Sequence, residues 1–290
     1  MLLVRCGVTV AVALTALSAT PRARAVADEI DQIVVAVSER VRSYYDRITT
    51  IVCTESVSQQ ELRNDSRPRG KPRDFVYELL VTREPSRTPE ATFEVKAERQ
   101  LKLVNGRPPR RRDQRECTDP QSAYTDPLTF LLPENRPRYR FAVAKAPGSS
   151  ASVIVLDFDE IETEPTRITW KGNCFTANGG RASGRVSIDR ASYDVVELQT
   201  RLAESFRLAT PFAMDVSGAR GFLTVERSDT SVRYRTIDFQ SPDETILLPQ
   251  SIVTVTTIIG ASTPRMRTTQ TFTNFRRFLT DVKIRPERAE

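Results

Sequence analysis

The sequence of 290 residues contains no histidine. Histidine is the usual general acid or base near neutral pH and a common metal ligand. Its absence excludes Ser-His-Asp triads, Cys-His dyads and every histidine-containing metal site. Carboxylate, lysine, tyrosine and cysteine side chains are all that remain for catalysis. The sequence therefore predicts a non-catalytic protein with no metal and no cofactor, and an enzyme built on those few groups stays a weaker alternative.

Long apolar runs are also missing, apart from one near the start of the chain. Residues 7–19 are mostly apolar and follow Arg5, and Pro21 prevents the apolar stretch from continuing. The run is shorter than the roughly 20 residues of a membrane-spanning helix. Ala23-Arg24-Ala25 has the form of a signal-peptidase site. We predict a signal peptide over residues 1–25, cleaved near Ala25, and a periplasmic or secreted protein that does not span the membrane. An uncleaved anchor is the alternative.

Cysteine is scarce, with four residues in the chain, and no C-x-x-C pair occurs. Export makes disulfide bonds feasible. Removal of the leader leaves Cys53, Cys117 and Cys174, so at most one intramolecular bond forms and one thiol is left over. We favour Cys117–Cys174, because both lie in loop-like sequence whereas Cys53 lies in a predicted strand.

The periodicity of apolar residues predicts one helix followed by many strands. Between residues 30 and 48, apolar side chains recur every three or four positions, which is typical of an amphipathic helix. Alternation with a period of two then dominates, with Ser228-Asp229 and Ser241-Pro242-Asp243 among the turn signals. The predicted strands are 50–62, 75–81, 93–103, 138–146, 152–159, 166–171, 184–189, 194–202, 221–228, 231–240, 246–259 and 265–277.

A segment rich in arginine and proline, residues 105–137, interrupts the strands. It predicts a short helix from about Asp126 to Leu132, with Pro127 in the first turn, packed on the same apolar face as the first helix. The resulting fold class is α+β: a large antiparallel open half β-barrel of about 11 strands, wrapped over an N-terminal amphipathic helix and a short helical insert. We expect one domain over residues 26–285 and a tail over 286–290.

Two local phrases resemble a known family. Gly184-Arg185-Val186-Ser187-Ile188-Asp189 followed by Ala191-Ser192-Tyr193-Asp194-Val195-Val196 is similar to a strand–turn–strand of the periplasmic lipoprotein-carrier superfamily, the LolA-, LolB- and LppX-like proteins. Leu248-Pro249 and Phe272-Thr273-Asn274-Phe275-Arg276-Arg277-Phe278 resemble the closing hairpin of uncharacterised exported relatives. The resemblance implies an open antiparallel barrel over helices and a concave cavity that holds lipid or acyl chains.

Charged residues cluster in two places. The segment 107–115 is the densest basic run, with Arg107, Arg110, Arg111, Arg112 and Arg115. It predicts either a surface for phosphate head groups, a membrane or an acidic partner, or a simple solvated loop. Without the leader the chain has 40 basic and 37 acidic residues, which is too weak a charge to predict nucleic-acid binding. Residues 157–164 hold five acids without EF-hand spacing, so an exposed strand end is the simpler interpretation than a calcium site.

Two interpretations of function stay open. The first is an exported, monomeric or weakly associated binding protein that holds a lipid or other hydrophobic ligand in the concave cavity. Its candidate ligand contacts come from the first helix, the insert and the strand after it: Val37, Val41, Phe130, Leu131, Phe141 and Val143. The second is a cell-envelope scaffold with a filled core that binds a protein partner. The same apolar residues suit both, so the sequence does not separate them.

Overall fold

The computed structural model describes residues 21–48, 50–85, 93–111, 113, 127–144, 151–161, 167–171, 174–178, 180–210, 221–260 and 265–277. Within them lie helix α1 (Pro21–Arg47) and the 3₁₀ turns η2 (Thr129–Leu131) and η3 (Arg136–Arg138). The strands are β1 (Thr50–Glu61), β2 (Arg73–Pro85), β3 (Phe93–Val104), β4 (Tyr139–Val143), β5 (Val153–Glu160), β6 (Arg167–Lys171), β7 (Cys174–Asn178), β8 (Ala182–Asp189), β9 (Val195–Leu202), β10 (Phe206–Ala209), β11 (Phe222–Gln240), β12 (Asp243–Ile259) and β13 (Arg265–Arg277).

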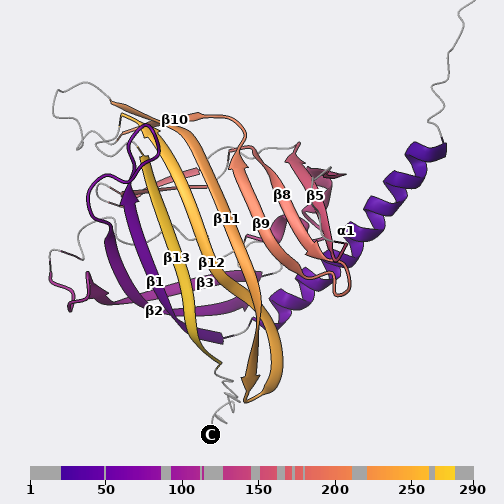
Figure 1. Ribbon diagram of the computed structural model, residues 1–290, viewed down its shortest axis with the longest axis horizontal. Coiled ribbons are helices and arrows are strands. Elements are labelled where there is room, and N and C mark those ends of the chain that lie inside the picture. The colour runs from indigo at the N-terminus through magenta and orange to yellow at the C-terminus, as the bar shows by residue number, and fades with distance from the viewer. Residues whose placement is uncertain are drawn as a thin grey trace, which may run out of the picture.

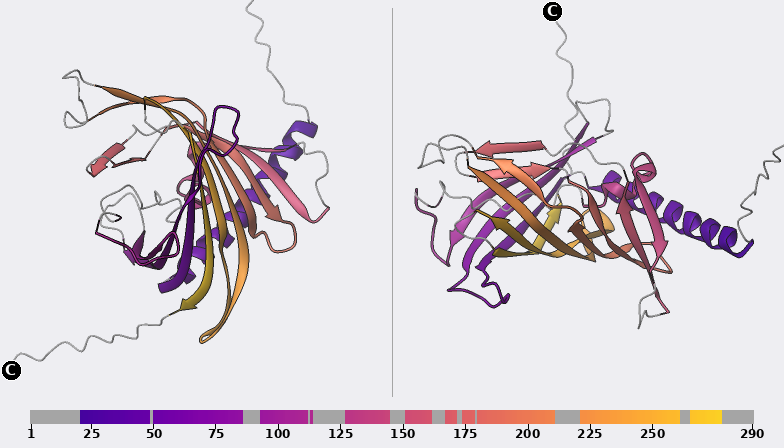
Figure 2. Two further views of the ribbon diagram at one scale, coloured as in Figure 1. Left: turned by 60° about the vertical axis from the view of Figure 1, so that its left-hand side comes forward. Right: turned by 90° about the horizontal axis from the view of Figure 1, so that it is seen from above.

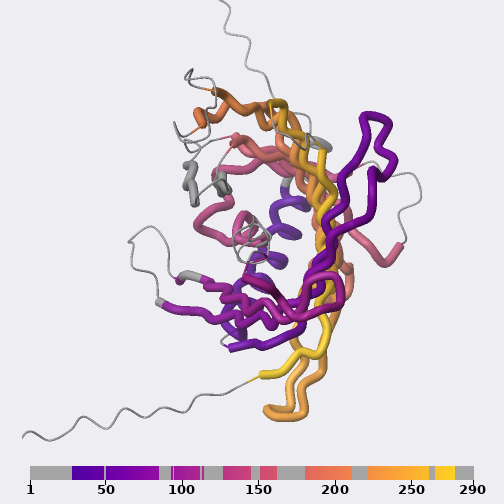
Figure 3. Tube along the Cα trace, turned by 90° about the vertical axis from the view of Figure 1, so that its left-hand side faces the viewer, coloured from indigo at the N-terminus to yellow at the C-terminus, as the bar shows by residue number. Residues whose placement is uncertain are grey.

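Eleven antiparallel strands form one curved sheet whose edges, β3 and β4, do not meet (Figures 1 and 3). The strand order is β3-β2-β1-β13-β12-β11-β9-β8-β5-β4, with β10 added beside β11. Most neighbours in this order are also neighbours in sequence, as in a meander, but β13 pairs with β1 and joins the first strands to the last ones. The fold class predicted from sequence, an open half-barrel of about 11 strands with an N-terminal helix, is confirmed.

Helix α1 lies on the concave side of the sheet, and its first turns project beyond the strands (Figure 2). The predicted three-and-four spacing is the buried face: Val34, Val37, Val41, Tyr44 and Tyr45 are each at most 4% exposed. Proline is favoured at the first position of a helix, and α1 begins with Pro21. The predicted cleavage near Ala25 therefore falls inside this helix.

The main core fills the space between α1 and the concave face. It joins apolar side chains of α1, β1, β2, β5, β8, β9, β11, β12 and β13 with those of the insert. The insert contributes Leu128, Phe130, Leu131 and Leu132, and the Leu128 amide donates a hydrogen bond of 3.3 Å to the Tyr45 hydroxyl. The prediction that the insert packs on the same apolar face as α1 is confirmed, although the described part of the insert forms the 3₁₀ turns η2 and η3 and Asp126 lies outside the described residues.

The predicted turn at Ser228-Asp229 is wrong. Both residues lie inside β11, which is 19 residues long and replaces the two strands predicted at 221–228 and 231–240. Asp229 pairs with Val255 on one side and with Arg201 on the other, and its carboxylate binds the Arg227 side chain. Neighbouring strands on both sides and a local ion pair thus keep two turn-forming residues extended. The short strands β7 and β10 were not predicted.

Candidate functional site

The structure places the predicted ligand contacts in two environments. Val37, Val41 and Leu131 are at most 2% exposed, and Phe130 is 8% exposed, all within the main core. Phe141 is half-buried against the same core. Val143 at the end of β4 is 49% exposed and lies outside the core. The structure therefore brings five of the six residues together and leaves Val143 apart.

Aromatic packing holds the insert in place. The Phe130 ring centroid lies 4.4 Å from that of Phe158 on β5 and 5.4 Å from that of Tyr139 on β4. Phe141 stacks on Phe130 at 6.3 Å. Such ring pairs add stability beyond the area that they bury. In this conformation the insert is therefore a tightly packed part of the core.

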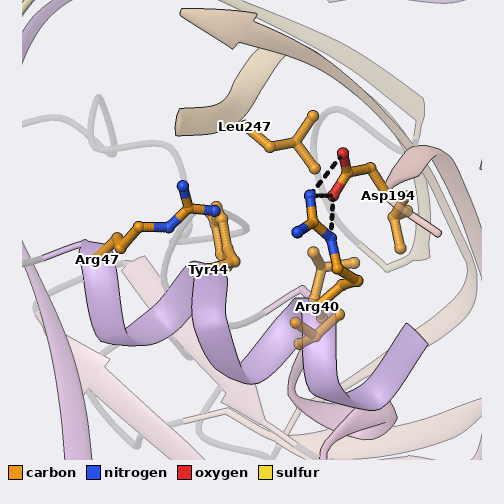
Figure 4. Close-up of a pocket in the computed structure, with 8 residues that line it drawn as sticks. Arg40, Tyr44, Arg47, Asp194 and Leu247 are labelled. Atoms are coloured by element: carbon orange, nitrogen blue, oxygen red, sulfur yellow. Dashed lines mark hydrogen bonds and ion pairs between the residues drawn. The ribbon is translucent and has the colours of Figure 1, made fainter. Parts of the chain in front are cut away.

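A small pocket lies between α1 and the strands beside it (Figure 4). The space available to a water-sized sphere is about 10 Å³, which holds one water molecule at most. Arg40 closes it by donating to both carboxylate oxygens of Asp194, at 3.0 and 3.1 Å. The part of the concave face under α1 is thus filled in this conformation, and ligand contact by Val37, Val41, Phe130, Leu131 and Phe141 stays a prediction.

A buried ion pair interrupts the apolar concave face beyond α1. Glu55 of β1 is fully buried, and Arg99 of β3 donates to its carboxylate at 2.6 and 3.3 Å. The Gln270 amide donates to the same carboxylate at 2.9 Å. Cys53 lies two positions before Glu55 on β1 and is a buried free thiol. Burial, together with the Glu55 charge, raises the pKa of this thiol to about 12. In the sequence, Glu55 stands among the alternating apolar residues Ile51, Cys53 and Val57, and this acid at an inward position is the signal that could have indicated the buried pair.

Next to this ion pair the concave face becomes polar. The strand register places one threonine from each of four adjacent strands in a row, on the face shared by the buried residues Val232 and Ile252. The hydroxyl oxygens of Thr230 and Thr254 are 3.1 Å apart. The row continues onto β1 and β2, and its members are Thr200, Thr230, Thr254, Thr268, Gln59 and Arg73.

This polar row ends in a groove at the β1–β2 loop, which we call the cationic groove. Its volume is about 530 Å³, within the range of ligand pockets, and it opens to solvent. The lining residues are Gln59, Glu61, Arg69, Gly70, Lys71, Arg73 and Met266. Three cationic side chains and one carboxylate give the lining a net positive charge. In the sequence these three cations alternate with Gly70 and Pro72, a weaker signal than the consecutive arginines of the segment 107–115.

The predicted basic patch lies beside the cationic groove but is partly neutralised. Asp113, 3% exposed, accepts hydrogen bonds from Arg107 at 2.9 and 3.3 Å and from the Arg110 amide at 2.7 Å. Hydrogen bonding to Asp113 raises the pKa of Arg107. Arg73 approaches the same carboxylate at 3.9 Å, so one buried acid connects the predicted patch to the groove. Arg110 and Arg111 are exposed, whereas Arg112 and Arg115 lie outside the described residues.

Two further apolar clusters lie on the two arms of the curved sheet, at the end away from α1. The β1–β3 cluster consists of Val57, Phe75, Tyr77 and Val104, with Leu101 beside it. The β10–β12 cluster consists of Leu208, Leu223 and Val225, with Leu202, Phe206 and Ile258 beside it. Register places both on the concave face, and in the described part of the chain neither contains a residue of α1.

The acidic residues of the run 157–164 point to opposite faces of the sheet. Asp157 points to the convex face, where Arg185 donates to it at 2.8 Å. Glu160 points inward, is 6% exposed and accepts hydrogen bonds from Arg138 and from the Ala182 amide. Alternate residues of a strand face opposite sides, so the acids do not converge on one point. Glu162 and Glu164 lie outside the described residues.

The favoured disulfide Cys117–Cys174 stays a prediction, because Cys117 and the side chain of Cys174 lie outside the described part of the structure. Where side chains are described, no group of three or more acidic or cysteine residues is arranged to hold a metal. Over the same part of the chain, no helix combines the length and the apolar character needed to cross a membrane.

Comparisons with known proteins yield a distant structural similarity. No protein family matches the chain in a scan of family profiles, and no curated protein matches its sequence. Among solved structures, the chain is similar to a LolA superfamily protein from Nitrosomonas europaea. The similarity covers 87% of this chain and 94% of that one, with 10% sequence identity and a TM-score of 0.34.

Proposed function

We propose that this protein is an exported, non-catalytic binding protein that holds a lipid or other hydrophobic ligand on the concave face of its half-barrel. The β1–β3 and β10–β12 clusters carry the proposal. They present apolar side chains from both arms of an open sheet, at the end where α1 does not fill the concavity. Export is proposed from the leader-like residues 1–25, and a monomer is the expected state.

Native mass spectrometry tests this proposal on protein purified from a periplasm without detergent. We expect an added mass that organic extraction removes and that proves to be a lipid. Uptake of a fluorescent fatty acid gives the second measurement. A bare mass together with no uptake would overturn the carrier function.

Two substitutions on β12 localise the ligand. Ile258 belongs to the β10–β12 cluster on the concave face, whereas Val255 pairs with Arg267 on the convex face, and both are half-buried. Ile258→Asn is expected to weaken ligand uptake, and Val255→Asn is the matched control that should not. Circular dichroism verifies that both variants fold. Equal uptake by the two variants would argue against a ligand on this arm.

A cell-envelope scaffold is the second candidate, and the small free volume beside α1, about 10 Å³, favours it. A scaffold needs no ligand cavity, and its exposed arginines would bind an acidic protein partner. It predicts a bare mass, no lipid uptake and a loss of partner binding when Arg110 and Arg111 are both changed to Gln. Retained partner binding in that variant would exclude this surface.

A further inference from the structure

The cationic groove holds charges that the fold itself leaves unneutralised. Arg69 and Lys71 are exposed, and no carboxylate in the described part of the chain lies within ion-pair distance of either side chain. Most other arginines along these strands pair with acids, as Arg276 does with Glu78 at 2.9 Å. These two cations lie in one groove with Arg73, which approaches Asp113 at 3.9 Å, so positive charge is concentrated there.

The backbone fixes the loop that carries these cations. The Arg69 amide donates to the Glu61 carbonyl at 2.8 Å, and the Gln60 side chain donates to the Arg69 carbonyl at 2.9 Å. Gly70 has a φ of +68°, a conformation that favours glycine and turns the loop back toward β2. The groove is therefore a built feature whose cations are presented from defined backbone positions.

Arg73 connects the groove to apolar surface. Its guanidinium carbon lies 5.0 Å from the Phe75 ring centroid, and the two residues share the concave face of β2. Phe75 belongs to the β1–β3 cluster. A cation and an apolar cluster thus meet along one strand, which is the arrangement that an amphiphile with an anionic head requires.

We propose that the cationic groove binds the phosphate group of an amphiphilic ligand, an assignment that rests on the proposed function because the apolar part would lie on the concave face. Arg69, Lys71 and Arg73 against Glu61 leave two net positive charges, which match the charge of about −1.5 to −2 of a phosphate monoester near neutral pH. Arginine binds phosphate oxygens in bidentate fashion, and lysine adds a point charge. A groove of about 530 Å³ has room for more than the phosphate alone.

Binding of a matched pair of ligands tests the assignment: lysophosphatidic acid and monoacylglycerol with the same acyl chain, below their micelle concentrations. The wild-type chain should bind the phosphate-bearing ligand at least about tenfold more tightly, from charge-assisted hydrogen bonds. The double variant Arg69→Gln, Lys71→Gln should lose that preference and keep its affinity for monoacylglycerol. The control Arg233→Gln, Arg267→Gln removes the same charge from the convex face and should behave as wild type.

Each other outcome has a distinct meaning. Equal affinity of the wild type for both ligands overturns this inference and leaves the proposed function standing. Binding of neither ligand refutes the proposed function itself. Inorganic phosphate that binds as tightly as lysophosphatidic acid shows a site for free phosphate and overturns the amphiphile. A control variant that loses the preference as fully as the groove variant assigns the effect to net charge and also overturns the inference.

Discussion

The buried pair of Glu55 and Arg99 gives the sharpest stability prediction. Replacing Arg99 with Met removes the donor that binds both oxygens of a fully buried carboxylate; among the described residues, the Gln270 amide at 2.9 Å is then the remaining side-chain donor. Breaking one side of a buried ion pair costs about 3–5 kcal/mol of unfolding free energy. For a chain of this size each kcal/mol lowers the Tm by roughly 2–4 °C, so the Tm should fall by roughly 6–20 °C.

Urea and thermal unfolding monitored by circular dichroism measure this loss. Arg276→Met is the matched control, because its ion pair with Glu78 at 2.9 Å is exposed and should contribute less than about 1 kcal/mol. The double variant Glu55→Leu, Arg99→Met should recover much of the stability, since no buried charge is left unpaired. A loss of under about 1 kcal/mol for Arg99→Met, or a double variant less stable than Arg99→Met, would refute the reasoning.

Three further predictions concern single core positions. Tyr234→Phe should be neutral or stabilising in urea unfolding, because the buried Tyr234 hydroxyl has no hydrogen-bond partner within the described part of the chain; a loss above about 1 kcal/mol contradicts this. The pKa of the buried Cys53 thiol is raised from 9.0 to about 12, so the unfolded state loses this proton at a lower pH than the folded state. The unfolding free energy of the wild type, measured relative to that of Cys53→Ala, should therefore fall as the pH rises from about 9 to 12. An unchanged difference between the two proteins at about pH 11 would contradict this. Gly184→Ala should lower the Tm strongly, because an added Cβ would lie 2.0 Å from the Gln199 carbonyl oxygen and 2.8 Å from the Phe158 ring; a Tm within 2 °C of wild type would exclude that contact.

The corrected turn at Ser228-Asp229 shows why local signals misplace some boundaries. Serine and aspartate favour turns in isolation, and the sequence alone offers nothing to oppose them. In the folded chain, β9 and β12 pair with this segment from both sides. Hydrogen bonds from two neighbouring strands outweigh a local preference of a fraction of a kcal/mol. The residues that pair with Asp229, Val255 and Arg201, both lie far from it in the sequence.

The candidate site shows the same division. The sequence indicated Arg107, Arg110 and Arg111 as parts of a basic run, but Arg107 donates to Asp113, an acid of the same segment that the fold buries. The unneutralised charge lies instead on Arg69 and Lys71, which are separated from that run by more than 30 positions. Only the pairing of β2 with β3 brings the two loops to the same end of the sheet.

By itself the sequence determined the periodicities: an amphipathic helix before residue 48, alternating strands after it, and an insert with apolar residues at 128–132 that interrupts the strands. These depend on neighbours within a few residues, which share a helix face or a strand face. The tertiary structure alone decided what the concave face presents. The strand register aligned four threonines in a row, buried Glu55 against Arg99, and filled the space under α1 while leaving a cationic groove at the other end. Register and loop contacts join residues far apart in the chain, and no local pattern encodes them.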